Sequence, residues 1–269
     1  MALLSDGKDI IDKDYKDFNS EMYSKGHSFF TYISDNADAL SSCCRLKNKL
    51  DKNEFSFTNG LTGVATGSKS VITLNLNRIV QDFCRSFKEY DKPCLAHNEW
   101  VNKPAMRKAF ADYLKPILDR IYKYHSAYNE LLWDLYNCGM MPVYSEGYIN
   151  LNQQFLTLGI NGVNEAAEFL GIKVNDNPEY EEFCKIITGT ISDSNRIAEN
   201  NPYNKKHQLK FNTEFVPAEN LAIKNYNWDK ENKYWVPEDR NCYNSYFYKP
   251  EDISISVPEK FRLHGKRYV

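Results

Sequence analysis

The sequence predicts an α/β fold with a largely parallel sheet. Short segments rich in β-branched and aromatic residues, typical of strands, alternate with segments in which apolar residues recur every three or four positions, as in helices. With 269 residues, of which 42% are hydrophobic, the chain is long enough to bury a sizeable core. No low-complexity linker and no internal repeat divides it. We therefore expect a single α/β domain over residues 1–269.

The elements predicted in the first third of the chain alternate between helix and strand. Gly26 is expected to end the first helix, because glycine readily adopts the left-handed conformation that terminates helices. Three glycines and five hydroxyl side chains favour a flexible loop before the second strand. In order, we expect a helix over 9–26, a strand over 28–33, a loop over 55–68, a strand over 70–76 and a helix over 77–90.

The longest predicted element is a helix over 104–138, in which Pro116 is expected to introduce a kink. The tail, residues 224–269, is rich in Tyr, Trp and Pro, which favours short strands and loops and a strand-like end at RLHGKRYV. Between them, residues 147–158 open a new segment after a Gly/Pro turn. We then expect helices over 163–170 and 178–199, a strand over 208–216, and a proline turn into a short helix over 217–223.

The predicted sheet is incomplete at both ends of the chain. No strand is predicted before the helix over 9–26, and the strand-like C-terminus carries no polar cap. Natural proteins normally cover the edges of their sheets, because unpaired backbone groups there invite aggregation. We therefore expect this chain to be part of a larger barrel or sheet whose N- and C-terminal portions are missing.

The charge balance argues against two classes of partner. Lys and Arg number 34 and Asp and Glu number 36, so the formal net charge is −2. A near-neutral chain lacks the electrostatic attraction that coats nucleic acid or an anionic membrane. No run approaches the roughly 18 apolar residues of a membrane span, and the N-terminus does not have the pattern of a signal peptide. We expect a cytoplasmic protein that binds neither nucleic acid nor membrane.

The seven cysteines form no regular framework. No CxxC, HxxxH or HExxH spacing occurs, so a metal site has no sequence support. In a reducing cytosol most of these thiols are expected to be packing residues. The adjacent pair Cys43–Cys44, which precedes Arg45, leaves three interpretations open: a reactive thiol beside a cation, simple packing, or a dithiol redox protein that forms a vicinal disulfide.

Two segments have features of anion sites. Residues 59–69 hold glycines and Lys69, but they lack the GxxxxGK[ST] order and precede a strand, which excludes a P-loop. The turn at 212–220 leaves a strand and enters a helix N-terminus, where free N–H groups attract anions. The same pattern is also an ordinary strand–helix connection, and its Glu214 and Glu219 are either acid–base groups or surface carboxylates.

Four segments taken together resemble the anaerobic (class III) ribonucleoside-triphosphate reductases, which are glycyl-radical enzymes. Their order and spacing cover most of the chain, which makes the joint match specific. The segments are SSCCRLKN at 41–48, TNGLTGVATGSKSVITLNLNRIV at 58–80, EGYINLNQQFLTLGINGVNEAAEFLG at 146–171 and FNTEFVPAENLAIK at 211–224, followed by CYNSYFY at 242–248.

The resemblance implies a ten-stranded α/β barrel with a central finger loop that carries a cysteine at its tip. The family pattern has a cysteine directly before arginine, which places the radical thiol on Cys44, with Cys43 as the alternative. A glycyl radical would oxidise this thiol to a thiyl, which abstracts the 3′ hydrogen of a ribonucleoside triphosphate and so leads to a deoxyribonucleotide for DNA replication. Leu46 stands where some reductases carry a carboxylate, so the reductant, formate or a thiol protein, stays open.

The resemblance also implies a substrate site. The turn PAEN is expected to hold the substrate phosphates through backbone N–H groups, and polar residues of the matching motifs are expected to line the pocket. The implied substrate-binding residues are Ser68, Asn75, Asn161, Pro217, Ala218, Glu219 and Asn220.

The glycyl-radical segment and the four-cysteine zinc site of the family are absent from this sequence. The resemblance therefore implies companion chains that carry the radical, which an iron–sulfur activase installs with S-adenosylmethionine, and the zinc. This chain itself would hold no cofactor, and the assembly would be an oligomer. A gene split into separately translated pieces would produce such a chain. The alternative is an inactive reductase-like scaffold or remnant.

Overall fold

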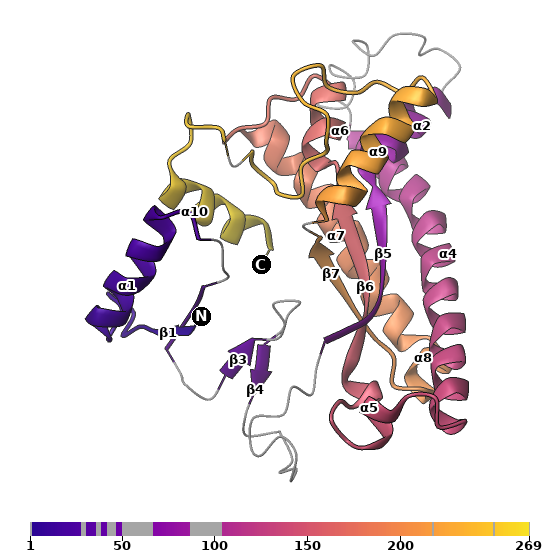
Figure 1. The fold of residues 1–269 in the computed structure, drawn as a ribbon. Coiled ribbons are helices and arrows are strands. Elements are labelled where there is room, and N and C mark those ends of the chain that lie inside the picture. The colour runs from indigo at the N-terminus through magenta and orange to yellow at the C-terminus, as the bar shows by residue number, and fades with distance from the viewer. Residues whose placement is uncertain are drawn as a thin grey trace. The chain divides into compact units, whose positions relative to one another are not determined.

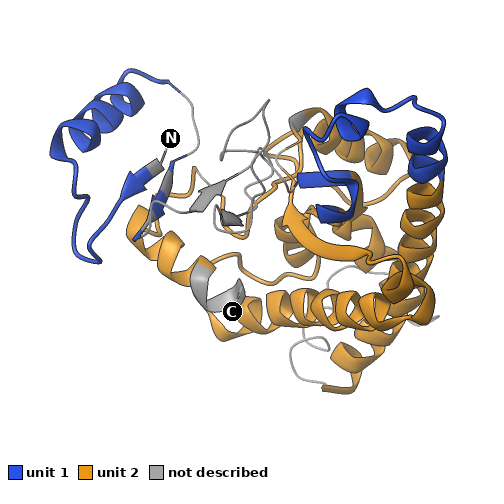
Figure 2. Ribbon diagram, turned by 90° about the horizontal axis from the view of Figure 1, so that it is seen from below, with its two compact units in different colours: residues 1–69, 131–155 blue, residues 70–130, 156–269 orange. Residues whose placement is uncertain are grey.

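The computed structural model describes residues 2–27, 31–35, 39–41, 47–49, 67–86, 104–216, 218–249 and 251–268. The chain divides into two compact units, which are coloured separately in Figure 2. One unit comprises residues 1–69 and 131–155, and the other comprises residues 70–130 and 156–269. That both belong to a single domain stays a prediction.

A three-stranded sheet forms the centre of the fold. Its strands are β5 (Gly67–Asn75), β6 (Gln154–Asn161) and β7 (Lys210–Phe215), with β6 in the middle. The three strands run in the same direction, as their arrows show in Figure 1. This confirms the predicted α/β fold with a parallel sheet. The ten-stranded barrel is not confirmed, because the described residues form only part of such a sheet.

Each strand of this sheet leads directly into a helix. Helices α2 (Leu76–Ser86), α6 (Val163–Phe169) and α9 (Glu219–Glu231) follow β5, β6 and β7 in turn. After β5 the described chain also forms helices α4 (Pro104–Asn137), α5 (Pro142–Ser145), α7 (Pro178–Asn200) and α8 (Pro202–Lys206), and a 3₁₀ turn at Leu151–Gln153. Helix α4 continues as one helix through Pro116.

The two faces of the sheet differ in chemistry. Side chains alternate between faces along a strand, so Leu156, Leu158 and Ile160 of β6 share one face, where they are fully buried in the apolar core. The opposite face carries Thr157 and Asn161. Parallel sheets usually bury two apolar faces, so a polar face on this one is unusual.

Neighbouring strands extend this polar face. The Thr157 hydroxyl donates a hydrogen bond of 2.6 Å to Asn212 Oδ1 on β7. At Gly159 a Cβ would overlap the Thr73 hydroxyl oxygen of β5 and lie 2.8 Å from Val216 Cγ2, so only glycine fits between these side chains. We define the polar face as Thr73, Asn75, Thr157, Gly159, Asn161, Asn212 and Glu214.

The described residues before position 50 form short strands and one helix. Strand β1 (Ala2–Leu4) pairs in parallel with β2 (Tyr32–Ser34), although no strand was predicted before the first helix. Helix α1 (Lys13–Ser24) begins after Asp12, whose carboxylate accepts a hydrogen bond of 2.9 Å from Tyr15 N–H and thereby caps it. Strands β3 (Ala39–Ser41) and β4 (Lys47–Lys49) form an antiparallel pair.

The prediction for the tail was wrong in two places. Helix α9 continues to Glu231, and the C-terminal run forms helix α10 (Val257–Tyr268) instead of a strand. Pro258 suits the first turn of a helix, and the acidic Glu259 beside it interacts favourably with the helix dipole. Leu263 then anchors the helix, because its side chain is almost completely buried.

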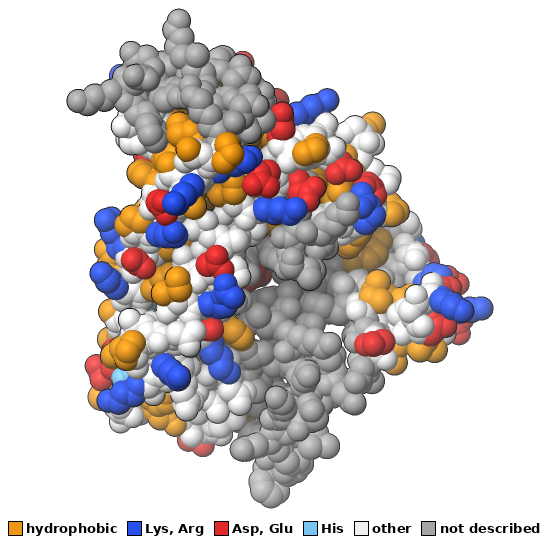
Figure 3. Space-filling view, turned by 180° about the vertical axis from the view of Figure 1, so that it is seen from behind, with side chains coloured by type: hydrophobic (Ala, Val, Ile, Leu, Met, Phe, Trp, Pro, Cys, Tyr) orange, Lys and Arg blue, Asp and Glu red, His pale blue; other side chains and the backbone are white. Residues whose placement is uncertain are grey.

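The surface of the described residues carries charges of both signs. In Figure 3, Lys and Arg side chains are interspersed with Asp and Glu over the face in view, without a block of one sign. This distribution agrees with the net charge of −2. None of the helices described here combines the length and the apolar character that crossing a membrane requires.

Candidate functional site

The carboxyl ends of the three strands lie at one edge of the sheet. Asn75 is the last residue of β5, Asn161 is the last residue of β6, and the turn after β7 enters α9. In open α/β sheets this edge is the usual place for a ligand, because the loops and the helix N-termini that follow the strands converge there. Two of the residues predicted to line a pocket, Asn75 and Asn161, therefore occupy equivalent positions on neighbouring strands.

Asn75 connects β5 to two helices. Its Oδ1 accepts a hydrogen bond of 3.2 Å from Arg78 N–H, which caps the N-terminus of α2. Its Nδ2 donates to Asp229 Oδ2 of α9 at 2.9 Å. Both ends of the amide are therefore engaged within the protein, which fixes the direction of the side chain at the carboxyl end of β5.

Asp229 is the centre of a buried polar cluster beside Asn75. Its side chain is fully buried and accepts hydrogen bonds of 2.6 Å from both Arg78 Nε and the Tyr243 hydroxyl. Asn77 Nδ2 also donates to the Tyr243 oxygen, at 2.6 Å. Burial, followed by the hydrogen bond to Asp229, raises the pKa of Tyr243 well above its usual value, so this tyrosine stays protonated.

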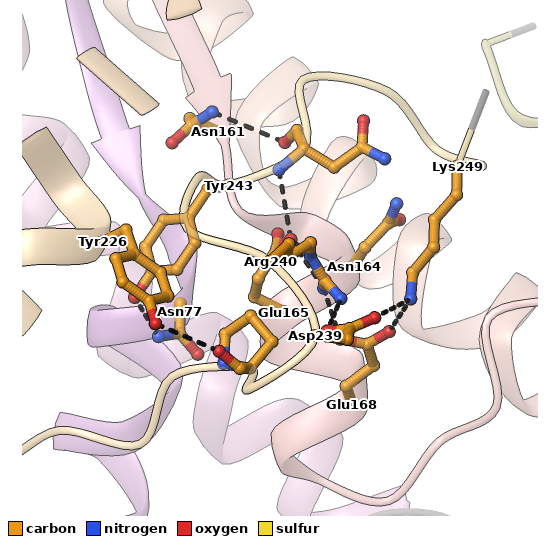
Figure 4. A network of polar contacts seen from close by, with 12 residues as sticks. Asn77, Asn161, Asn164, Glu165, Glu168, Tyr226, Asp239, Arg240, Tyr243 and Lys249 are labelled. Carbon is orange, nitrogen blue, oxygen red and sulfur yellow. Dashed lines mark hydrogen bonds and ion pairs between the residues drawn. The ribbon is translucent and has the colours of Figure 1, made fainter. Parts of the chain in front are cut away.

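Asn161 occupies the corresponding position on β6. Its side chain is buried, and its Oδ1 accepts a hydrogen bond of 3.0 Å from Asn225 Nδ2 of α9. Its Nδ2 lies 3.4 Å from the Asn244 carbonyl oxygen and 3.3 Å from Ser245 Oγ, and Figure 4 shows it directed toward that segment. Asn161 thus joins the sheet edge both to α9 and to the segment CYNSYFY.

The turn after β7 prepares the N-terminus of α9. Ala218 N–H donates to the Val216 carbonyl at 2.8 Å, and helix α9 starts at Glu219 after the N-cap residue Ala218, which makes no side-chain cap. Asn220 is exposed in the first turn. Uncapped N–H groups at a helix N-terminus attract anions through their partial positive charge. Pro217 and the side chain of Glu219 lie outside the described residues.

The remaining predicted residues lie elsewhere. Ser68 is the second residue of β5, seven residues before Asn75, and strand alternation places it on the face opposite to Asn75. The structure therefore does not bring Ser68 together with Asn75 and Asn161. Cys43 and Cys44 lie outside the described residues, in the connection between the antiparallel strands β3 and β4.

Sequence reasoning missed several polar residues of this edge. The motif around Asn75 contained Asn77, and the segment at 242–248 contained Tyr243, but nothing in their spacing separates a buried hydrogen-bonding residue from a surface one. Asp229 lies more than 150 residues from its partners in α2, so no local pattern could have identified it. Within the part of the chain that the structure describes, no three His, Cys, Asp or Glu side chains are grouped as a metal site.

The fold and this edge define an α/β protein with a cluster of polar residues at the carboxyl ends of parallel strands. A family model described as anaerobic ribonucleoside-triphosphate reductase matches residues 5–268. The chain therefore belongs to the anaerobic ribonucleoside-triphosphate reductase family, a family of oxidoreductases. No curated protein sequence matches the chain.

Solved structures of anaerobic ribonucleotide reductases share the fold. The Thermotoga maritima enzyme in complex with dATP and CTP has a TM-score of 0.69 and 25% sequence identity, and the match covers 98% of this chain and 40% of that chain. The same enzyme with citrate in the active site has a TM-score of 0.68 at 25% identity, with 98% and 43% covered. Another anaerobic ribonucleotide reductase has a TM-score of 0.67 at 26% identity, with 98% and 37% covered. The chain thus spans about two fifths of the length of these enzymes.

Proposed function

We propose that this chain is the part of an anaerobic ribonucleoside-triphosphate reductase that binds the substrate and supplies the radical thiol. The observation that carries the proposal is the family match over residues 5–268, combined with a polar strand-end edge built from residues of the matching motifs. The Thermotoga maritima relative was solved with CTP, and we extend a ribonucleoside triphosphate to this chain as its substrate class.

We assign the radical thiol to Cys44, with Cys43 as the alternative. Both cysteines lie in the short connection between β3 and β4, and a connection between two antiparallel strands suits the tip of a finger loop. In the proposed reaction the thiol gives up its hydrogen atom, and the resulting thiyl takes the 3′ hydrogen of the ribose. The 2′ hydroxyl then leaves as water, and a reductant, formate or a thiol protein, supplies the two electrons that balance its loss.

Sulfur suits this transfer because an S–H bond and a ribose C–H bond have similar strengths, so the hydrogen atom can pass in both directions. A serine or tyrosine hydroxyl has a bond of different strength and would not replace it. The protein contributes placement: it holds the sulfur near the 3′ carbon and excludes water from the reacting atoms.

The substrate phosphates are assigned to the turn of Pro217, Ala218, Glu219 and Asn220. The uncapped N-terminus of α9 supports this assignment, because its first N–H groups are available to an anion. Asn75 and Asn161 are proposed to form the adjacent pocket wall. Their amides are held by neighbouring side chains, so they would present a rigid edge to the ribose.

We propose that the glycyl radical and the zinc site belong to polypeptide outside these residues, in the same protein or in a companion chain. An iron–sulfur activase that uses S-adenosylmethionine would install the radical. The assembly is proposed to be a cytoplasmic oligomer that produces deoxyribonucleotides.

The test is anaerobic reduction of CTP to dCTP. The purified chain is mixed with the activase, S-adenosylmethionine, a reductant and a polypeptide that carries the glycyl-radical segment. We expect dCTP only from the complete mixture. Product from the chain alone would overturn the assignment of the radical to other polypeptide, and no product from the complete mixture would favour the inactive scaffold.

A further inference from the structure

Glu165 is a fully buried carboxylate in helix α6 that the proposed reaction does not use. Its Oε1 accepts two hydrogen bonds from the guanidinium of Arg240, from Nε at 2.9 Å and from Nη2 at 2.8 Å (Figure 4). The Arg240 side chain is itself only 14% exposed. Burial raises the pKa of the Glu165 carboxyl, and the charge of Arg240 opposes that effect. A buried charge is retained only where it is paired, so this pair is built into the fold.

The same oxygen of Glu165 also holds a backbone group. Asn244 N–H donates to Oε1 at 3.1 Å. The Asn244 carbonyl in turn accepts from Gly162 N–H at 3.1 Å and from Asn161 Nδ2 at 3.4 Å. Both polar groups of this one residue's backbone are therefore fixed by the turn between β6 and α6.

Fixing Asn244 also places its neighbour, Ser245. Ser245 is 8% exposed, and its Oγ accepts a hydrogen bond from Asn161 Nδ2 at 3.3 Å. Among the described residues, no acceptor takes the hydrogen of the Ser245 hydroxyl. A hydroxyl that accepts one bond and still holds a donor is suited to an oxygen of a ligand.

We propose that Glu165 is a positioning residue for substrate binding. Through Arg240 and the Asn244 N–H, it holds Ser245 beside Asn161 at the carboxyl end of β6, where the Ser245 hydroxyl donates a hydrogen bond to an oxygen of the bound ribonucleotide. This inference rests on the proposed function, because it takes a ribonucleoside triphosphate as the ligand.

Glu168, one turn further along α6, provides a matched control. Its carboxylate also binds Arg240 Nη2, and it forms an ion pair of 2.6 Å with Lys249 Nζ. Figure 4 shows both acids directed at the same arginine. Glu168 makes no hydrogen bond to Asn244, so it shares the charge of the cluster without holding the backbone of that residue.

The experiment measures CTP binding to the full chain by calorimetry in a double-mutant cycle. We expect Ser245→Ala and Glu165→Gln each to raise the dissociation constant for CTP at least fivefold. The double variant should bind CTP no more weakly than Glu165→Gln alone. Glu168→Gln is expected to stay within twofold of the wild type and to act independently of Ser245→Ala. A purely structural role for Glu165 would lower stability without this coupling.

A second measurement covers the case in which Glu165→Gln folds poorly. Glu165→Asp keeps the charge but withdraws the oxygen by one methylene, and hydrogen exchange of the Asn244 amide is expected to rise at least tenfold while the amides of α7 stay protected. Additive losses in the cycle, an unchanged affinity in Ser245→Ala, or unchanged exchange at Asn244 would each overturn the inference. A wild type that does not bind CTP would overturn the proposed function, and the inference would fall with it.

Discussion

A buried histidine in α4 makes the stability of the fold depend on pH. His125 has no exposed surface, and its ring lies 6.3 Å from the ring of Phe211, centroid to centroid. Neither ring nitrogen makes a hydrogen bond of normal geometry in the described part of the chain. Burial lowers the pKa of His125 to about 4, an effect that the nearby backbone of Thr157 partly offsets.

The size and direction of the effect follow from the two pKa values. The unfolded chain takes up a proton at His125 near the ordinary value of 6.5, whereas the folded chain does so only near 4. The stabilisation of the folded state by neutral His125 is therefore complete above about pH 6.5, and it is lost as the pH falls toward 4. The full difference corresponds to about 3 kcal/mol in the free energy of unfolding, of which about 2 kcal/mol is lost by pH 5.

The assay is urea unfolding, followed by circular dichroism, at pH 7 and at pH 5 for the wild type and for His125→Leu. Leucine fills a similar volume and breaks no hydrogen bond, so we expect its stability at pH 7 to match the wild type within about 1 kcal/mol. Every other titrating group is shared, so the loss between the two pH values should be about 2 kcal/mol smaller in the variant. Equal losses in both proteins would refute the reasoning.

Three further predictions concern other buried groups. Gly159→Ala should lower the free energy of unfolding by more than about 2 kcal/mol, because the added Cβ has no space. Gly189→Ala in α7, where a Cβ meets no other atom, should raise the free energy of unfolding by about 0.5–1 kcal/mol. Equal effects of the two substitutions in chemical denaturation would contradict this. Asp229→Asn should lower the free energy of unfolding by about 2–4 kcal/mol in the same assay, because it leaves the partly buried Arg78 without its counter-charge. A loss under about 1 kcal/mol would contradict the account. Burial raises the pKa of Cys84 to about 12. Iodoacetamide at pH 8 should therefore label Cys84 at least 100-fold more slowly than the exposed Cys138, as followed by mass spectrometry. Comparable labelling rates would be inconsistent with that pKa.

Local patterns predicted the elements that carry a strong period. The apolar spacing over 104–138 predicted α4 almost to its ends, and the strand over 208–216 contains β7. The tail was predicted poorly, because the aromatic residues that favour strands over 224–269 pack in helices and irregular segments. Short segments of this kind take their conformation from tertiary contacts, which a local pattern does not contain.

Some residues of the candidate site were predictable from local sequence motifs, and others were not. Asn75 and Asn161 were identified through their motifs, and the structure places each at the carboxyl end of its strand. Asp229 and Glu165 were not identified, because their importance comes from burial and from ion pairs with Arg78 and Arg240, which lie 75 or more residues away. A sequence shows an acidic residue at such a position, but only the fold shows that its charge is buried and paired.

The central claim is that one sulfur of this chain takes the 3′ hydrogen of the ribose. The most direct measurement compares Cys44→Ser with Cys43→Ser in the complete anaerobic mixture, with dCTP formation as the readout and circular dichroism to confirm folding. We predict that Cys44→Ser forms no dCTP, while Cys43→Ser still does. Turnover by a folded Cys44→Ser variant would contradict the assignment of the thiyl to this residue.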